Sequence, residues 1–178
     1  MPTIPVAPGL RLVDLQPEDA DELFALTDAN RAYLRRWLPW LDLTRGVAAT
    51  ETFIDFARRE ARAGTALQCA IWEQQVIVGM CGFNQIDRVN RSATIGYWLA
   101  ADTQGRGVMT RCVTALTLHG FTGLGLHRAV VAIAEGNARS EAVALRCGFA
   151  FEGVARDAEW LYDRYVNHRV FARLRTDA

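Results

Sequence analysis

The sequence contains no lysine, so all 20 of its basic side chains are arginines. Twenty acidic side chains balance them, and the formal net charge is zero. Nucleic acids and anionic membranes attract proteins that carry an excess of positive charge. The composition therefore predicts neither of them as a partner, and any binding of phosphate has to be local.

Long hydrophobic runs and paired-cysteine motifs are also missing. No window approaches the roughly 18 consecutive apolar residues of a membrane-spanning helix. The first ten residues show no basic region followed by an apolar segment, so we expect a cytoplasmic location. The three histidines are solitary, and no metal site is predicted. The cysteines show no CxxC spacing and are predicted to be reduced core thiols: Cys69, Cys81, Cys112 and Cys147.

The residues that are present suit a globular protein. Of the 178 residues, 51% are apolar and 22% are charged, which is enough apolar surface for one well-formed core. We therefore expect a single domain spanning residues 1–178.

Apolar periodicity predicts an α+β protein with its helices packed on a sheet. A rich aromatic stretch, YLRRWLPWLDL, occupies residues 33–43, where Pro39 interrupts the helical pattern. The predicted order is a strand at 10–15, a helix from Pro17, a helix at 48–63, two strands within 66–87, a strand at 92–99, a helix at 108–121, a strand at 128–134, a helix at 139–147 and two strands within 149–174.

A glycine-containing loop, DTQGRGVMT at 102–110, precedes the third of these helices. It lacks the lysine of a nucleotide-triphosphate loop and the third glycine of a dinucleotide-binding fingerprint. Glycine still allows a phosphate to approach the backbone, and free amides at a helix amino terminus attract negative charge. The amides from Arg106 to Thr110, the Arg106 cation and the Thr110 hydroxyl are candidate donors. A simple turn that caps the helix explains the same residues.

Five segments together resemble a known family. QGRGVM at 104–109 is similar to the acetyl-coenzyme A loop of GNAT N-acetyltransferases, and NARSEAVALRCGFAFEG at 137–153 is similar to the helix and strand that follow it. YLRRWLPWLD, IGYWL and AEWL resemble the RimJ/RimL branch, whose members include ribosomal-protein amino-terminal acetyltransferases.

The resemblance implies a three-layer fold whose mixed, mostly antiparallel sheet splays open between its fourth and fifth predicted strands, after Leu99 and before Arg128. Acetyl-coenzyme A (acetyl-CoA) would lie in that gap. The residues expected to contact it are Trp98, Leu99, Ala100, Gln104, Gly105, Arg106, Gly107, Val108, Met109, Thr110, Asn137 and Ser140. Without the family, Asn137 and Ser140 would be an ordinary helix entrance.

Three positions bear on the catalytic chemistry. Met109 replaces the usual glycine or alanine at the end of the loop, as it does in the RimL-like branch. Ala144 stands where many members place a tyrosine acid, and Ile133 stands near the cysteine proposed as catalytic in some RimL-like enzymes. The sequence therefore excludes a tyrosine acid at 144 and gives no support to a cysteine mechanism.

Glu159 matches the glutamate that is implicated in this family, and we expect it to act as general base, directly or through water. The alternative is an exposed carboxylate on a strand. Asp157 and Glu152 are substitute bases, and Tyr162 or Tyr165 could serve as acid.

The acceptor is the least determined part of the reaction. Tyr33, Trp37 and Trp40 are expected to line its channel, although core packing or a homodimer face would explain the same rings. An α-amine, with a pKa of about 8, needs less help from a base than a lysine near 10.4. The leading hypothesis is therefore acetyl transfer to a protein amino terminus. The alternatives are acetylation of a small-molecule amine, such as an antibiotic or an amino-acid conjugate, and a non-catalytic acyl-CoA sensor.

Overall fold

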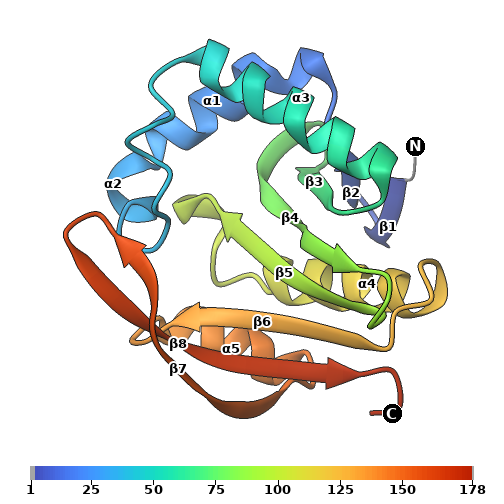
Figure 1. Ribbon diagram of the computed structural model, residues 1–178. Helices are drawn as coiled ribbons and strands as arrows, with labels where there is room; N and C mark the ends of the chain where they lie inside the picture. The colour runs from blue at the N-terminus through green and yellow to red at the C-terminus, as the bar shows by residue number, and fades with distance from the viewer. Residues whose placement is uncertain (1–2, 178) are drawn as a thin grey trace.

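The computed structural model describes residues 3–177, which form one eight-stranded sheet with helices on both faces (Figure 1). The strand order in the sheet is β1-β2-β3-β4-β5-β6-β8-β7. The strands are β1 (Thr3–Ala7), β2 (Leu10–Asp14), β3 (Leu67–Glu73), β4 (Val76–Asp87), β5 (Ser92–Leu99), β6 (Arg128–Ala134), β7 (Ala150–Leu161) and β8 (Arg164–Leu174). The helices are η1 (Pro17–Asp19), α1 (Ala20–Ala29), α2 (Arg31–Leu34), α3 (Val47–Ala63), η2 (Ala101–Thr103), α4 (Val108–Thr122) and α5 (Ala138–Arg146).

The centre of the sheet is split. All neighbouring strands are antiparallel except β5 and β6, which run parallel. These two strands pair only from Ser92 with Arg128 to Thr94 with Val130. Beyond Thr94 the remaining residues of β5 and β6 diverge, which confirms the predicted opening between these two strands.

Two hydrophobic cores lie on opposite faces of the sheet. One contains α4 and α5, and the other contains α1, α2 and α3. Alternate residues of β3 serve the two cores: Cys69 and Ile71 point to the first and Ala70 to the second. Because both faces are covered, β4 is continuously buried from Ile77 to Phe83. All four cysteines are buried and free, which confirms the prediction of core thiols.

The predicted elements agree with the structure except at three places. The edge strand β1 was not predicted, because Pro5 cannot donate a backbone hydrogen bond and weakens the strand signal. The apolar spacing of residues 48–63 puts Phe53 on one helix face with Ile54 and Ala57, but Phe53 is 36% exposed, while Ile54 and Ala57 fill the core. In the aromatic stretch, only α2 is helical before a series of turns.

Among the described residues, no helix is both long and apolar enough to cross a membrane.

Candidate active site

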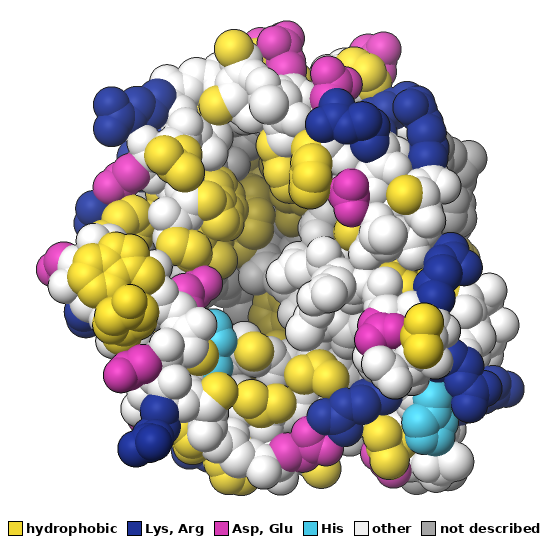
Figure 2. All heavy atoms as spheres, viewed as in Figure 1, with side chains coloured by type: hydrophobic (Ala, Val, Ile, Leu, Met, Phe, Trp, Pro, Cys, Tyr) yellow, Lys and Arg dark blue, Asp and Glu magenta, His cyan; other side chains and the backbone are white. Residues whose placement is uncertain are grey.

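A cavity of about 1010 Å³ opens where β5 and β6 diverge. The space-filling view shows a deep hollow in the middle of this face, with hydrophobic side chains around it (Figure 2). Most residues expected to bind the cofactor or the acceptor line this cavity: Tyr33, Trp37, Trp98, Leu99, Gln104, Gly105, Gly107, Val108, Met109, Thr110, Asn137, Ser140 and Glu159. Three expected residues, Trp40, Ala100 and Arg106, do not line it.

The amino end of α4 presents free backbone amides to the cavity. Gly105 and Gly107 adopt positive φ angles of 77° and 72°, which bring the loop back onto the helix. The helical bond of Arg111 N–H to Gly107 O, at 3.1 Å, leaves the amides of the first turn, Val108 to Thr110, without a backbone partner within the helix. Because the N-cap residue is Gly107, no side chain caps them. The loop is therefore a turn that also leaves the amino end of α4 able to bind an anion.

The end of β5 offers one backbone donor to the gap. The Ala100 amide donates to Val78 O at 2.9 Å and is therefore committed to β4. Backbone amides alternate in direction along a strand, so the neighbouring Leu99 N–H points to the open side. The Ala100 amide is therefore not free to bind a ligand, and Leu99 is the residue at this end of β5 whose amide can donate into the gap.

Arg106 does not supply the expected cation. Its guanidinium forms an ion pair with Glu73, 2.7 Å away, because the loop turns this side chain outward. Two other arginines, Arg139 and Arg146, line the cavity instead. They are seven residues apart, which places them on one face of α5, and this spacing is a signal that the sequence itself contains.

Hydrogen bonds connect these arginines to the loop and to the aromatic wall. Arg139 Nη1 donates to Gln104 Oε1 at 2.7 Å, and Arg146 Nε donates to Thr110 Oγ1 at 3.3 Å. The Gln104 amide in turn donates to Tyr33 Oη at 2.6 Å. Gln104 therefore orients a ring of the expected acceptor channel. Trp40 packs against the second core instead, which corrects its assignment to the channel.

A hydroxyl pair lies on the other side of the cavity. Asn137 Oδ1 accepts from Ser140 N–H at 3.2 Å, so it caps α5. Tyr97 Oη and Ser140 Oγ are 2.8 Å apart. Burial raises the pKa of Tyr97 well above its usual range, which keeps the phenol protonated at neutral pH. Tyr97 lies in the IGYWL segment, but no pattern in the sequence marks it as a site residue.

Glu159 lies in the cavity wall beside His168, which the sequence showed only as a solitary histidine. Its Oε2 is 3.4 Å from His168 Nε2, and the two side chains are 30% and 17% exposed. Both side chains line the cavity, so a carboxylate and an imidazole lie side by side facing the gap.

The substitute acids and bases lie elsewhere. Glu152 pairs with Arg128, which lowers the pKa of its carboxyl group, and Asp157 is exposed in β7. Tyr165 is 60% exposed and packs edge-on against Trp160. Tyr162 Oη donates to Leu38 O at 2.5 Å. None of these four candidates lines the cavity.

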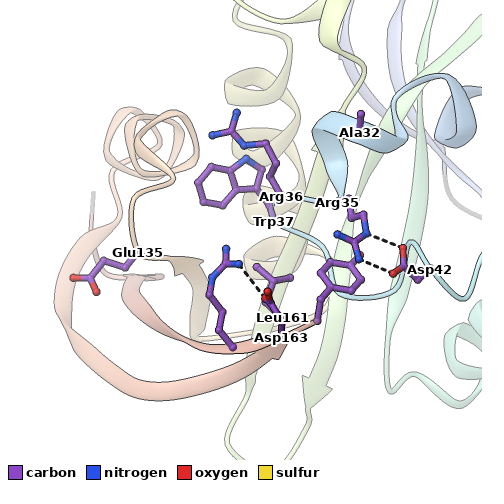
Figure 3. A pocket seen from close by; sticks show the side chains of 10 residues that line it. Ala32, Arg35, Arg36, Trp37, Asp42, Glu135, Leu161 and Asp163 are labelled. Atoms are coloured by element: carbon purple, nitrogen blue, oxygen red, sulfur yellow. Dashed lines mark hydrogen bonds and ion pairs between the residues drawn. The ribbon is translucent and has the colours of Figure 1, made fainter.

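A second, smaller cavity of about 640 Å³ adjoins the first, and Trp37 lines both (Figure 3). Here the turn of the β7–β8 hairpin contacts the aromatic stretch after α2. Arg35 makes a two-pronged bond to Asp42, both at 2.8 Å, and stacks 3.8 Å above the Tyr162 ring. The hairpin therefore closes one end of the divided sheet.

The arrangement defines a class of protein. An elongated ligand with a phosphate group can rest that group on the α4 amides and extend along β5 near Leu99, with the Glu159 carboxylate of β7 in the same cavity. The gap, the donor and the carboxylate suit the transfer of an acyl group to an amine.

Comparison with known proteins identifies the family. The GNAT acetyltransferase domain matches residues 9–150. The ribosomal-protein-serine acetyltransferase of Escherichia coli strain K12 is 30% identical over 97% of this chain and 96% of its own. The putative ribosomal N-acetyltransferase YdaF of Bacillus subtilis strain 168 is 34% identical over 86% and 84% of the two chains. The chain belongs to the GNAT acetyltransferase family.

Solved structures agree with this family. A RimL structure, described as a ribosomal L7/L12 α-N-protein acetyltransferase in complex with coenzyme A, superposes with a TM-score of 0.94 at 30% identity, covering 97% and 98% of the chains. A microcin C7 self-immunity acetyltransferase in complex with acetyl-CoA and AMP gives 0.91 at 29% identity, covering 95% and 94%. This chain is thus an N-acetyltransferase that uses acetyl-CoA as its acyl donor, which confirms the predicted fold, activity and donor and sets the non-catalytic sensor aside.

Proposed function

We propose that this enzyme acetylates the amino-terminal α-amine of a ribosomal protein in the cytoplasm, with Glu159 as its general base. The main support for this proposal is the position of the Glu159 carboxylate, which lies beside His168 in the cavity of the divided sheet. The names of the relatives support the acceptor, since RimL and the E. coli enzyme are described as acting on ribosomal proteins.

The chain's own groups fit the acyl donor. The amides of Val108, Met109 and Thr110 would hold its pyrophosphate, and Arg139 and Arg146 add positive charge nearby. Asn137 and Ser140 line the path between this end and β5. Acetyl-CoA supplies an activated acetyl thioester.

The reaction requires the movement of one proton and the polarisation of one carbonyl group. As the amine nitrogen bonds to the acetyl carbon, Glu159 accepts the amine proton, directly or through water, and Leu99 N–H donates to the carbonyl oxygen. The carbon–sulfur bond then breaks. The Tyr97 hydroxyl, which burial keeps protonated and which lies 2.8 Å from Ser140 Oγ, faces the same cavity and is our candidate source of the proton for the leaving thiolate.

Replacing Glu159 with glutamine tests the proposed base. We expect turnover to fall by about 10²- to 10⁴-fold while acetyl-CoA affinity stays unchanged, because the base acts only in the chemical step. Release of free thiol measures turnover, and isothermal titration measures affinity. Glu152→Gln is the matched control, since Glu152 lies on the same strand but outside the cavity. Unchanged turnover of Glu159→Gln from pH 6 to 8 would remove it as base.

The acceptor needs a separate experiment. A peptide with a free amino terminus and no lysine should release thiol, whereas the same peptide with a blocked terminus and one internal lysine should not. An α-amine is partly neutral near pH 7, whereas the pKa of a lysine amine is more than two units higher, so nearly all of it is protonated at that pH. Turnover of the second peptide alone would contradict the proposed acceptor.

A small-molecule amine is the second candidate acceptor. The microcin immunity acetyltransferase, whose structure contains acetyl-CoA and AMP, is similar to this chain, and the adjoining cavity beside Trp37 offers room for a compact acceptor. Amino-acid conjugates and aminoglycosides therefore belong in the same thiol-release panel. Exclusive turnover of one of them would select this alternative.

We also propose a homodimer and no nucleic-acid partner. Trp160 and Tyr165 are 53% and 60% exposed at the β7–β8 edge of the sheet and support a contact between copies there, in place of the ring cluster around Trp37. The balanced charge supports the absence of nucleic acid. Light scattering gives the mass in solution, and a monomer at micromolar concentration would contradict the dimer.

A further inference from the structure

The β7–β8 hairpin contains an irregularity next to Glu159. Nearer its base, Ala155 pairs with His168, and nearer its turn, Glu159 pairs with Val166. Between these two pairs β7 contains three residues and β8 contains only Asn167. The hairpin is therefore bulged by two extra residues on β7.

The bulge determines where Glu159 lies along the hairpin. If the register of Ala155 and His168 continued without it, Asp157 would lie opposite Val166, and Glu159 would lie two residues nearer the turn. At about 3.4 Å per residue, this is a displacement of about 7 Å away from His168. A shift of two residues leaves the side chain on the same face of the sheet. The bulge thus changes the position of the carboxylate and not its face.

One side chain holds the bulge in place. Asn167 Oδ1 accepts from the Asp157 amide at 2.9 Å, and Asn167 Nδ2 donates to Glu135 Oε2 at 3.1 Å. The Glu135 amide also donates to Asn167 O at 2.9 Å. Glu135 directly follows β6, so these bonds tie the bulge to β6, which lies on the same side of the gap as the hairpin.

The backbone of the bulge needs such support. Asp157 has a φ of 48°, in the left-handed region that non-glycine residues seldom occupy. Strained conformations of this kind persist only where the surroundings hold them. Asn167 supplies the single side-chain acceptor that the structure gives to the Asp157 amide.

We propose that Asn167 is a positioning residue for Glu159: its side chain clamps the Arg156–Ala158 bulge to Glu135 and so holds the Glu159 carboxylate at His168. The inference rests on the proposed role of Glu159 as base. A base must lie within hydrogen-bond reach of its proton, and a misplacement of about 1 Å can reduce the rate by about a hundredfold.

Asn167→Ala is the first variant to test. We expect turnover to fall about 10- to 100-fold, with acetyl-CoA affinity within about twofold of the wild type, because the α4 amides are untouched. Asn90→Ala is the matched control: its amide also donates to a carboxylate, that of Asp87 at 2.6 Å, but in the turn after β4. This control should keep wild-type turnover.

A double-mutant cycle separates positioning from general destabilisation. Adding Asn167→Ala to Glu159→Gln should change turnover by less than about threefold, because the group being positioned is already gone. A merely structural role would reduce turnover in both backgrounds by the same factor.

A paired exchange tests the bond itself and guards against misfolding. Asn167→Asp alone places two carboxylates together and should impair turnover. Combining it with Glu135→Gln exchanges donor and acceptor while keeping an acceptor for the Asp157 amide, and should restore turnover to within about threefold of the wild type.

The outcomes separate the two proposals. Wild-type turnover of Asn167→Ala beside an impaired Glu159→Gln would overturn the positioning role and leave the base in place. An equal loss in both backgrounds, or no recovery in the paired exchange, would overturn it as well. Wild-type turnover of Glu159→Gln would instead overturn the base itself.

Discussion

The buried cysteines and the ionisable residues of the cavity differ sharply in their access to solvent. Burial raises the pKa of Cys69 and of Cys112 to about 12, and raises that of Cys81 well above its usual range. The cavity residues Glu159 and His168 remain partly exposed beside each other. The thiols therefore serve packing, whereas the carboxylate and the imidazole remain accessible to a substrate.

The cysteines provide a test at this scale. A thiol with a pKa of about 12 is ionised in only about one molecule in 10⁴ at pH 8, because a raised pKa keeps the proton on sulfur up to a higher pH. We expect the native protein to react negligibly with an aromatic disulfide reagent at pH 8 and all four thiols to react after denaturation. Rapid labelling of Cys69 or Cys112 in the folded protein, located by mass spectrometry, would contradict their burial.

At the scale of the element, α4 combines two functions at its amino end. Gly107 starts the helix in the left-handed conformation, and an added Cβ there would meet only Arg111 Nη1 at 3.4 Å within the protein. The protein itself leaves this space free. Whether a larger side chain is tolerated at position 107 therefore depends on the φ angle there and on the ligand that the cavity binds.

Valine at position 107 separates these two effects. A β-branched residue at a φ of 72° is strained by about 1–3 kcal/mol, and its side chain would also crowd a pyrophosphate on the α4 amides. We expect Gly107→Val to lose stability and at least about tenfold in acetyl-CoA affinity. Gly125→Val is the matched control, with a φ of 69° and open space around it, and should lose stability alone. Wild-type affinity in Gly107→Val would reduce the loop to a turn.

At the scale of the whole molecule, the sheet consists of two parts that hardly touch in the middle. β1 to β5 form one part and β6 to β8 the other, and only three residue pairs connect them through β5 and β6. The helices and the docked hairpin turn hold the two parts together on either side (Figure 1). A ligand in the cavity would contact both parts and stabilise their arrangement.

Thermal unfolding measures this effect. At a free concentration one hundred times its dissociation constant, acetyl-CoA should stabilise the native state by about 2.7 kcal/mol. For a chain of this length, that corresponds to a rise in Tm of about 5–11 °C. Scanning fluorimetry at several ligand concentrations checks both values. Gly107→Val at the same concentrations should shift far less, and an unchanged Tm of the wild type at saturation would contradict binding in the gap.

The sequence predicted the local features of the site well. Periodicity placed the helices and strands around the loop, and the absence of a lysine and of a third glycine excluded two other phosphate-binding designs. Its direct contacts were harder to predict. Arg106 pairs with Glu73, 33 residues away, and Arg139 and Arg146 face the cavity in its place. Nothing in the local pattern around Arg106 distinguishes these outcomes.

The sequence by itself determined the order of the elements after β1, the amide-rich start of α4 and the resemblance to an acetyltransferase, because each depends on residues close together in the chain. Only the tertiary structure decided that the Ala100 amide is bonded to β4 while the Leu99 amide faces the gap, and that a bulge held by Asn167 places Glu159 beside His168. These features depend on strand register and on contacts across the sheet. Such contacts form between segments far apart in sequence, so no local pattern encodes them.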